Sequence, residues 1–185
     1  GATAVGNYTI AAGKDAIAVD TGASAVGYQA LAVGYSSSAF GSGAQAIGNY
    51  STAIGTSSHA YNTGDVAIGQ NALANGSGSY YDSAPATAVG TNSVASYTGA
   101  SAFGTGATAS AKYSTALGAN ARATGEYATA VGDNAYASGC DSVVGGDAAA
   151  ASGDHGVALG AFASASGNSS SAVVKYARAS GDFGA

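Results

Sequence analysis

The chain has 185 residues, of which 30 are glycine, 46% are apolar and only 8% are charged. Alanine dominates the apolar share, which excludes a compact core of large side chains, and the apolar content excludes ordinary charge-driven disorder. Five basic residues stand against ten acidic ones, for a net charge of −5 at pH 7, so we expect no nucleic-acid partner and no anionic membrane partner. Because no apolar run is long enough to span a bilayer as a helix, we also expect no direct membrane insertion.

A tetrapeptide of one small or β-branched residue, alanine, one apolar residue and glycine recurs along the chain at a nearly constant spacing. Its copies lie at residues 24–27, 38–41, 52–55, 66–69, 87–90, 101–104, 115–118, 129–132 and 157–160. Further glycines lie halfway between them, so the underlying lattice runs in steps of seven from Gly6 to Gly181, and 20 of its 26 positions are glycine. Two of the exceptions are Asp20 and Asn62, residue types that tolerate positive φ. The lattice positions are therefore predicted to be turns with left-handed or otherwise strained backbone.

The residues just before each lattice position are small. The residue two before is alanine in 24 of 26 cases, and the residue four before is small everywhere except at Asp65. Both lie on one face of a strand, because side chains alternate along a strand. Glycine at every seventh position opposes a helix. The pattern predicts an all-β solenoid in which each coil spans two lattice steps, contributes two short strands and encloses an alanine-filled interior.

Taken in chain order, the elements are a run of irregular coils over residues 1–26, regular coils, an enlarged surface loop at about residues 76–86, and further regular coils to residue 185. The loop is predicted because the lattice gains one extra step between Gly69 and Gly90 and because this segment holds the only proline. At Val174 a valine stands where glycine is expected, so the last coils are expected to be altered. All coils together are predicted to form one domain over residues 1–185.

The residue just before the glycine points to the outer face, and in one strand of each coil it is apolar. This set, called the apolar column below, consists of Val26, Phe40, Ile54, Ile68, Val89, Phe103, Leu117, Val131, Leu159 and Val173, and Gly145 interrupts it. Left bare, it would form one large exposed patch. Closed symmetry around it is the expected remedy, and coverage by another part of the same long chain is the alternative.

The equivalent column of the other strand begins with Val33, Ile47 and Tyr61 and then becomes polar. Together with Tyr80 and Tyr81 in the loop, Tyr61 is the candidate ligand contact, since tyrosine offers a large apolar body with a polar tip. The alternative is that subunit packing buries Val33 and Ile47.

Residues for catalysis are too dispersed to form a site. The two histidines, His59 and His155, are expected roughly 30 Å apart, and neither is expected to reach the single cysteine, Cys140. The acidic residues Asp133, Asp141, Asp147 and Asp154 are predicted to be solvated turn residues, with a weak cation site at the turns as the alternative. We therefore expect no enzyme activity, no catalytic residue, no cofactor and no metal site.

The motif resembles that of the heads of trimeric autotransporter adhesins of the Yersinia-adhesin type, in which the sequence NSVAIG recurs. Residues 64–69 (GDVAIG) match its last four positions and residues 92–95 (NSVA) its first four. The resemblance implies a left-handed parallel β-roll in each chain, a homotrimer with the apolar column at its axis, and display on a Gram-negative outer membrane. The stalk and the anchor would lie in parts of the protein outside this sequence.

The function implied by the resemblance is attachment to host extracellular matrix, such as collagen, fibronectin or laminin, to host-cell receptors or to other surfaces. Two alternatives remain at this stage. One is an inert structural spacer or fibre segment, and the other is an ice-binding solenoid, for which the threonines at positions 52, 87, 115 and 129 form an interrupted column.

Overall fold

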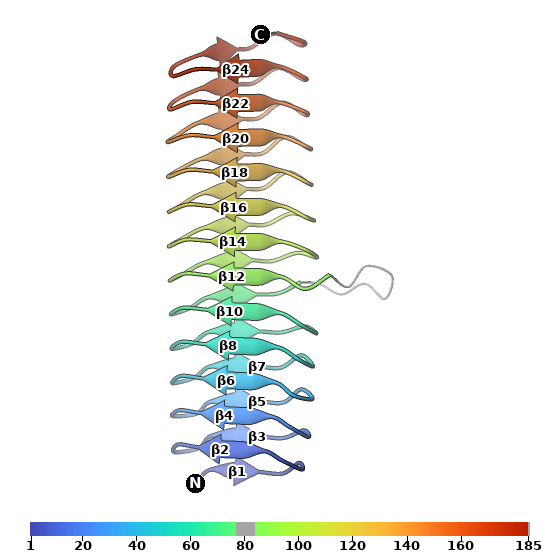
Figure 1. Cartoon of the computed structure of the whole chain (residues 1–185), viewed down its shortest axis with the longest axis vertical. Coiled ribbons are helices and arrows are strands. Elements are labelled where there is room, and N and C mark those ends of the chain that lie inside the picture. The colour runs from blue at the N-terminus through green and yellow to red at the C-terminus, as the bar shows by residue number, and fades with distance from the viewer. Residues whose placement is uncertain (77–83, 185) are drawn as a thin grey trace. The chain divides into compact units, whose positions relative to one another are not determined.

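The computed structural model describes residues 1–76 and 84–184, and these form 25 short strands and no helix. None of the described residues therefore lies in a helix long and apolar enough to cross a membrane. The chain divides into two compact units, Gly1–Gly99 and Ala100–Ala185, and each is built from coils that contribute one strand to each of two parallel sheets (Figure 1). The all-β parallel solenoid predicted from the sequence is confirmed.

In unit 1 the odd-numbered strands form one sheet, here called the odd sheet, and the even-numbered strands form the even sheet. The odd sheet consists of β1 (Thr3–Ala4), β3 (Ile17–Ala18), β5 (Leu31–Ala32), β7 (Gln45–Ala46), β9 (His59–Ala60), β11 (Leu73–Ala74) and β13 (Val94–Ala95). The even sheet consists of β2 (Ile10–Ala12), β4 (Ser24–Val26), β6 (Ser38–Phe40), β8 (Thr52–Ile54), β10 (Val66–Ile68) and β12 (Thr87–Val89).

Unit 2 repeats the arrangement. Its odd sheet consists of β15 (Thr108–Ala109), β17 (Arg122–Ala123), β19 (Tyr136–Ala137), β21 (Ala150–Ala151), β23 (Ser164–Ala165) and β25 (Arg178–Ala179). Its even sheet consists of β14 (Ser101–Phe103), β16 (Thr115–Leu117), β18 (Thr129–Val131), β20 (Val143–Gly145), β22 (Val157–Leu159) and β24 (Ser171–Val173).

Strand pairing within each unit follows the sequence period. Each residue pairs with the one two lattice steps further along the chain, as Phe40 does with Ile54. The same shift holds in the first coils, where Thr3 pairs with Ile17 and Ile10 with Ser24, so this pairing is regular where the sequence analysis expected irregular coils over residues 1–26. Between β10 and β12 the shift is three lattice steps, which places an insertion of one step in this coil. Most of the loop predicted at residues 76–86 lies outside the described residues.

The interior of both units is filled by the small side chains predicted from the lattice. The alanines two before the lattice position are inaccessible to solvent in nearly every coil, as at Ala53 and Ala116. Where the residue four before is serine, its hydroxyl often donates to the carbonyl three residues back, as from Ser51 to Gly48 at 2.7 Å. In the described coils the interior thus consists of methyl groups and hydroxyl groups, apart from Val144 and the carboxylate of Asp65.

The lattice glycines of the two sheets differ in backbone conformation, and the prediction of strained backbone applies to only one of the two sets. Glycines that end strands of the even sheet have φ between +124° and +143°, a region that residues with a side chain rarely adopt. Those that end strands of the odd sheet do not have positive φ, and neither do Asp20 and Asn62. The interpretation of these two residues as positive-φ substitutes was therefore wrong.

At Gly153, on the odd-sheet side, glycine is needed because the next coil comes too close. A Cβ built on Gly153 would overlap the carbonyl oxygen of Gly167 and lie 2.5 Å from its carbonyl carbon. The left-handed residue of these turns is instead the second residue after the lattice position, such as Tyr50 at φ 58° or His155 at φ 56°. Most residues at this position carry a side chain, so the residue types in the turn did not indicate a left-handed conformation there.

Among the described residues, Val174 is the one valine held at positive φ, at 108°, in the place that glycine occupies in the preceding coils. A β-branched residue in this region costs about 1–3 kcal/mol, while glycine adds about 1 kcal/mol of chain entropy to the unfolded state. We expect Val174→Gly to raise stability by about 1 kcal/mol, measured as a higher denaturation midpoint. Val173→Gly, which removes a side chain from relaxed backbone, should lower it.

Candidate functional site

The apolar column lies on the outer face of the even sheets, as predicted from side-chain alternation. In unit 1, backbone pairing stacks Val26, Phe40, Ile54, Ile68 and Val89 one above another. Phe40 and Ile54 are each 40% exposed although they flank fully buried alanines. A single chain therefore leaves this face open to solvent.

Unit 2 carries the same feature. Phe103, Leu117 and Val131 are stacked by strand pairing, and beyond the interruption at Gly145 come Leu159 and Val173. These side chains are 37–55% exposed. At the interruption, a Cβ on Gly145 would meet only the flexible end of Leu159, at 3.0 Å. In each unit the column thus forms an exposed apolar ridge on the even sheet.

The odd sheet of unit 1 carries the second apolar patch. Val33 and Ile47 are half-buried, and Tyr61 is 40% exposed with its ring stacked on that of His59 at 5.6 Å. Ile17 and Val19, at 39% and 37% exposure, extend this patch and were missed in the sequence, although Val19 occupies the same lattice position as Val33. Tyr80 and Tyr81 lie outside the described residues, so the candidate contact that joins them to Tyr61 stays a prediction.

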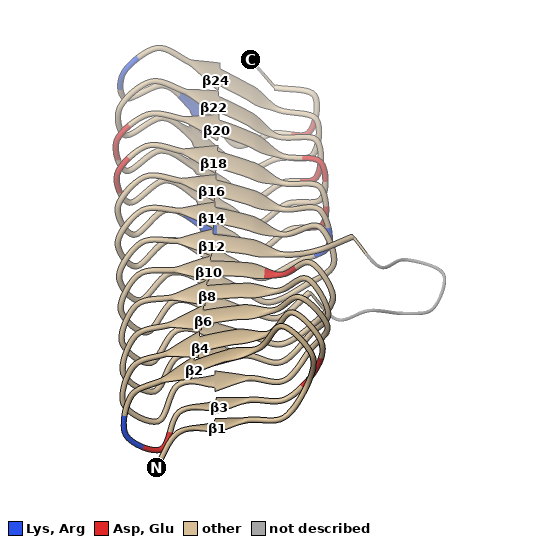
Figure 2. Cartoon of the chain, turned by 60° about the horizontal axis from the view of Figure 1, so that its bottom comes forward, with Lys and Arg blue, Asp and Glu red and all other residues tan. Residues whose placement is uncertain are grey.

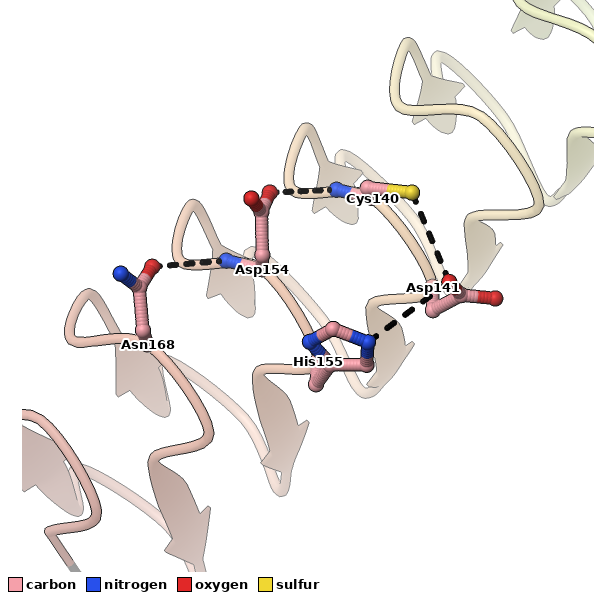
Figure 3. A network of polar contacts seen from close by, with 5 residues as sticks. All are labelled: Cys140, Asp141, Asp154, His155 and Asn168. Atoms are coloured by element: carbon pink, nitrogen blue, oxygen red, sulfur yellow. Dashed lines mark hydrogen bonds and ion pairs between the residues drawn. The ribbon is translucent and has the colours of Figure 1, made fainter.

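A ladder of polar contacts runs along the odd-sheet turns of unit 2 (Figure 3). The carboxylate of Asp154 accepts from the backbone N–H of Cys140 at 2.9 Å, and the amide oxygen of Asn168 accepts from that of Asp154 at 3.2 Å. Asp182 continues the ladder by accepting from Asn168 at 3.0 Å. These side chains therefore bond successive coils together, a role beyond that of the solvated turn residues predicted from the sequence.

In the same turns Cys140 and His155 both contact Asp141. The two residues are therefore closer together than we expected from the sequence. The Cys140 thiol donates to Asp141 Oδ2 at 3.4 Å, and His155 Nε2 lies 3.8 Å from the same oxygen. Partial burial raises the pKa of the Cys140 thiol, and the hydrogen bond and negative charge of Asp141 raise it further. A raised pKa keeps the thiol protonated, the opposite of what an activated nucleophile needs. Across residues 1–76 and 84–184, no three candidate ligands are grouped so that they could hold a metal ion.

The repeat of this chain matches that of a known protein family. The family described as "YadA head domain repeat (2 copies)" matches residues 21–44, 32–58, 46–72, 60–79, 98–121, 123–149 and 151–173, which is more than half of the chain. The chain belongs to the YadA head domain family. The resemblance to trimeric autotransporter adhesin heads, predicted from the NSVAIG-like motif, is thereby confirmed.

Among solved structures, this YadA-like head is similar to the collagen-binding domain of the Yersinia adhesin YadA, with 22% identity and a TM-score of 0.37 over 92% of this chain and 68% of that chain. No curated protein matches it. The family repeats cover every member of the apolar column except Val89, which follows the insertion. The insertion thus lies where the YadA head repeat is interrupted.

Proposed function

We propose that this YadA-like head forms a homotrimer through the apolar column and attaches a bacterial cell to extracellular matrix. The observation that carries the proposal is the exposed apolar column on the even sheet of each unit, five side chains in each, over an interior built mostly of alanine. If buried, they would contribute roughly 15–30 kcal/mol for each chain, as an upper bound. Three chains related by closed symmetry would bury this ridge without leaving a free edge.

Family membership supports the further parts of the proposal. The head would be displayed on a Gram-negative outer membrane by segments of the protein beyond this sequence, and each chain would form a left-handed roll. Collagen, which the matched Yersinia domain is named for binding, is the first matrix protein to test, followed by fibronectin, laminin and host-cell receptors. Attachment by many shallow contacts would gain avidity from three identical chains.

Assembly is tested by Phe103→Asp, which places a carboxylate on the ridge of unit 2. We expect this variant to sediment as a monomer, because an unpaired charge buried at the axis carries a large desolvation cost. The matched control is Ser110→Asp, a charge added to the odd sheet of the same unit, and it should sediment as the unmodified trimer. A stable monomer of the unmodified protein would contradict the proposal.

Attachment is tested by presenting the purified trimer to collagen, fibronectin, laminin and intact cells. Binding to at least one of them that disappears in the monomeric Phe103→Asp variant supports an avidity-dependent adhesin. Absence of binding to all four, with the trimer intact, would leave a structural spacer as the better description.

A further inference from the structure

The arginines of this chain are placed unlike its other charges. Arg122 and Arg178 are the only two, and both are exposed on the odd sheet of unit 2 at equivalent lattice positions, in β17 and β25. The acidic residues of unit 2 all lie at turns, and they are Glu126, Asp133, Asp141, Asp147, Asp154 and Asp182 (Figure 2). Among the described residues of this acidic chain, the strands of the odd sheet of unit 2 thus carry positive charges and no negative ones.

The rest of this face is rich in hydroxyl groups. Next to the alanine of each strand, the outward residues are Ser110, Thr124, Ser138, Ser152, Ser166 and Ser180, and Thr108 and Ser164 lie beside them. At the C-terminal end, Ser164, Ser166, Arg178, Ala179 and Ser180 line an open pocket of about 240 Å³. The pocket combines one guanidinium with three hydroxyls.

Neither arginine has a carboxylate partner within the described residues. Arg122 lies over the ring of Tyr136, 5.3 Å from its centroid. The pKa of the Tyr136 hydroxyl is lowered, mainly by hydrogen bonds with Thr124 and Ser138. The charge of Arg122 lowers this pKa further, while burial raises it. Both guanidinium groups therefore have donors available for an anion from outside the chain.

We propose that the odd-sheet face of unit 2 binds an acidic polysaccharide, with a sugar carboxylate held by Arg178 in the pocket. The planar guanidinium fork matches a carboxylate with two parallel hydrogen bonds, and serine hydroxyls both donate to and accept from sugar hydroxyls. Near Arg122, the exposed ring of Tyr136 offers an apolar surface against which a sugar ring packs.

The separation of the two arginines favours an extended ligand. Arg122 and Arg178 are four coils apart, roughly 19 Å at the strand spacing, so one ligand that reaches both is a chain of several sugars. The acidic turns on either side repel anions that do not lie along the column of hydroxyls. The proposal rests on the proposed trimer, because packing through the even sheets leaves this face open in all three chains.

The test measures binding of the trimer to immobilised polygalacturonate, whose sugars carry carboxylates, at physiological ionic strength, with neutral dextran and dextran sulfate as comparison surfaces. We expect binding to polygalacturonate and none to dextran. Arg122→Gln with Arg178→Gln should weaken binding by about tenfold or more, since each change removes charge-assisted hydrogen bonds. The matched control, Lys14→Gln with Lys175→Gln, removes the same charge from turns and should change affinity by less than about twofold. Sedimentation confirms that all variants remain trimeric.

Three results would overturn the inference. These are no binding of the unmodified trimer to polygalacturonate, an equal loss in the arginine and lysine variants, and tighter binding to dextran sulfate than to polygalacturonate, which would show that the face recognises charge rather than a carboxylate. If the trimer binds a matrix protein in the attachment assay but not polygalacturonate, this inference fails while the proposed function stands. Sedimentation as a monomer would instead count against the proposed function.

Discussion

Gly153→Ala is expected to destabilise unit 2 by about 3 kcal/mol or more, the upper end of what overpacking causes. Its added Cβ would overlap the backbone carbonyl of Gly167 in the next coil, and backbone that is fixed on both sides by hydrogen bonds cannot move aside as a side chain can. The measurement is the midpoint of chemical denaturation, followed by circular dichroism at strand wavelengths.

Gly181 supplies the matched control for this prediction. It occupies the same lattice position, and none of the described atoms lies within 4 Å of a Cβ built on it. Gly181→Ala should therefore leave the denaturation midpoint unchanged or slightly raised, because alanine reduces the entropy of the unfolded chain. Equal losses in both variants would show that these glycines are required for their own backbone conformation and not for the approach of the next coil.

Asp65→Ala is the second change with a large expected effect, at about 3 kcal/mol or more of lost stability. Asp65 is fully buried, and its carboxylate accepts from the backbone N–H groups of Asn62 at 2.9 Å, Gly76 at 3.1 Å and Ala86 at 2.8 Å. Gly76 and Ala86 lie at the two ends of the segment that carries the insertion of one lattice step. Without the carboxylate, these buried donors would be left without an acceptor, at about 1–3 kcal/mol each.

Two further variants sharpen this test. Asp65→Asn keeps one acceptor oxygen but turns an N–H toward a backbone donor, so its loss should be intermediate. Asp147→Ala removes an exposed turn carboxylate and should change stability by less than about 0.5 kcal/mol. Unchanged stability in Asp65→Ala would refute the role of this carboxylate in closing the base of the insertion.

Much of the fold could be predicted because its determinants are local. Side-chain alternation places Ala53 inside and Ile54 outside whatever the rest of the chain does, and the lattice of every seventh position sets two strands in each coil. The same alternation predicted every member of the apolar column. The register between coils then followed from the repeat, including the longer shift at the insertion.

What the sequence determined by itself is the coil, its small-residue interior and the faces to which its side chains point, since these depend on period and residue size. Only the tertiary structure showed why position 153 requires glycine and which backbone N–H groups donate to Asp65. It also showed that Asp141 lies between Cys140 and His155. Each depends on atoms in the neighbouring coil, whose distances no local pattern specifies. The same holds for the finding that Arg122 and Arg178 have no carboxylate partner within residues 1–76 and 84–184, because it depends on where the neighbouring side chains lie.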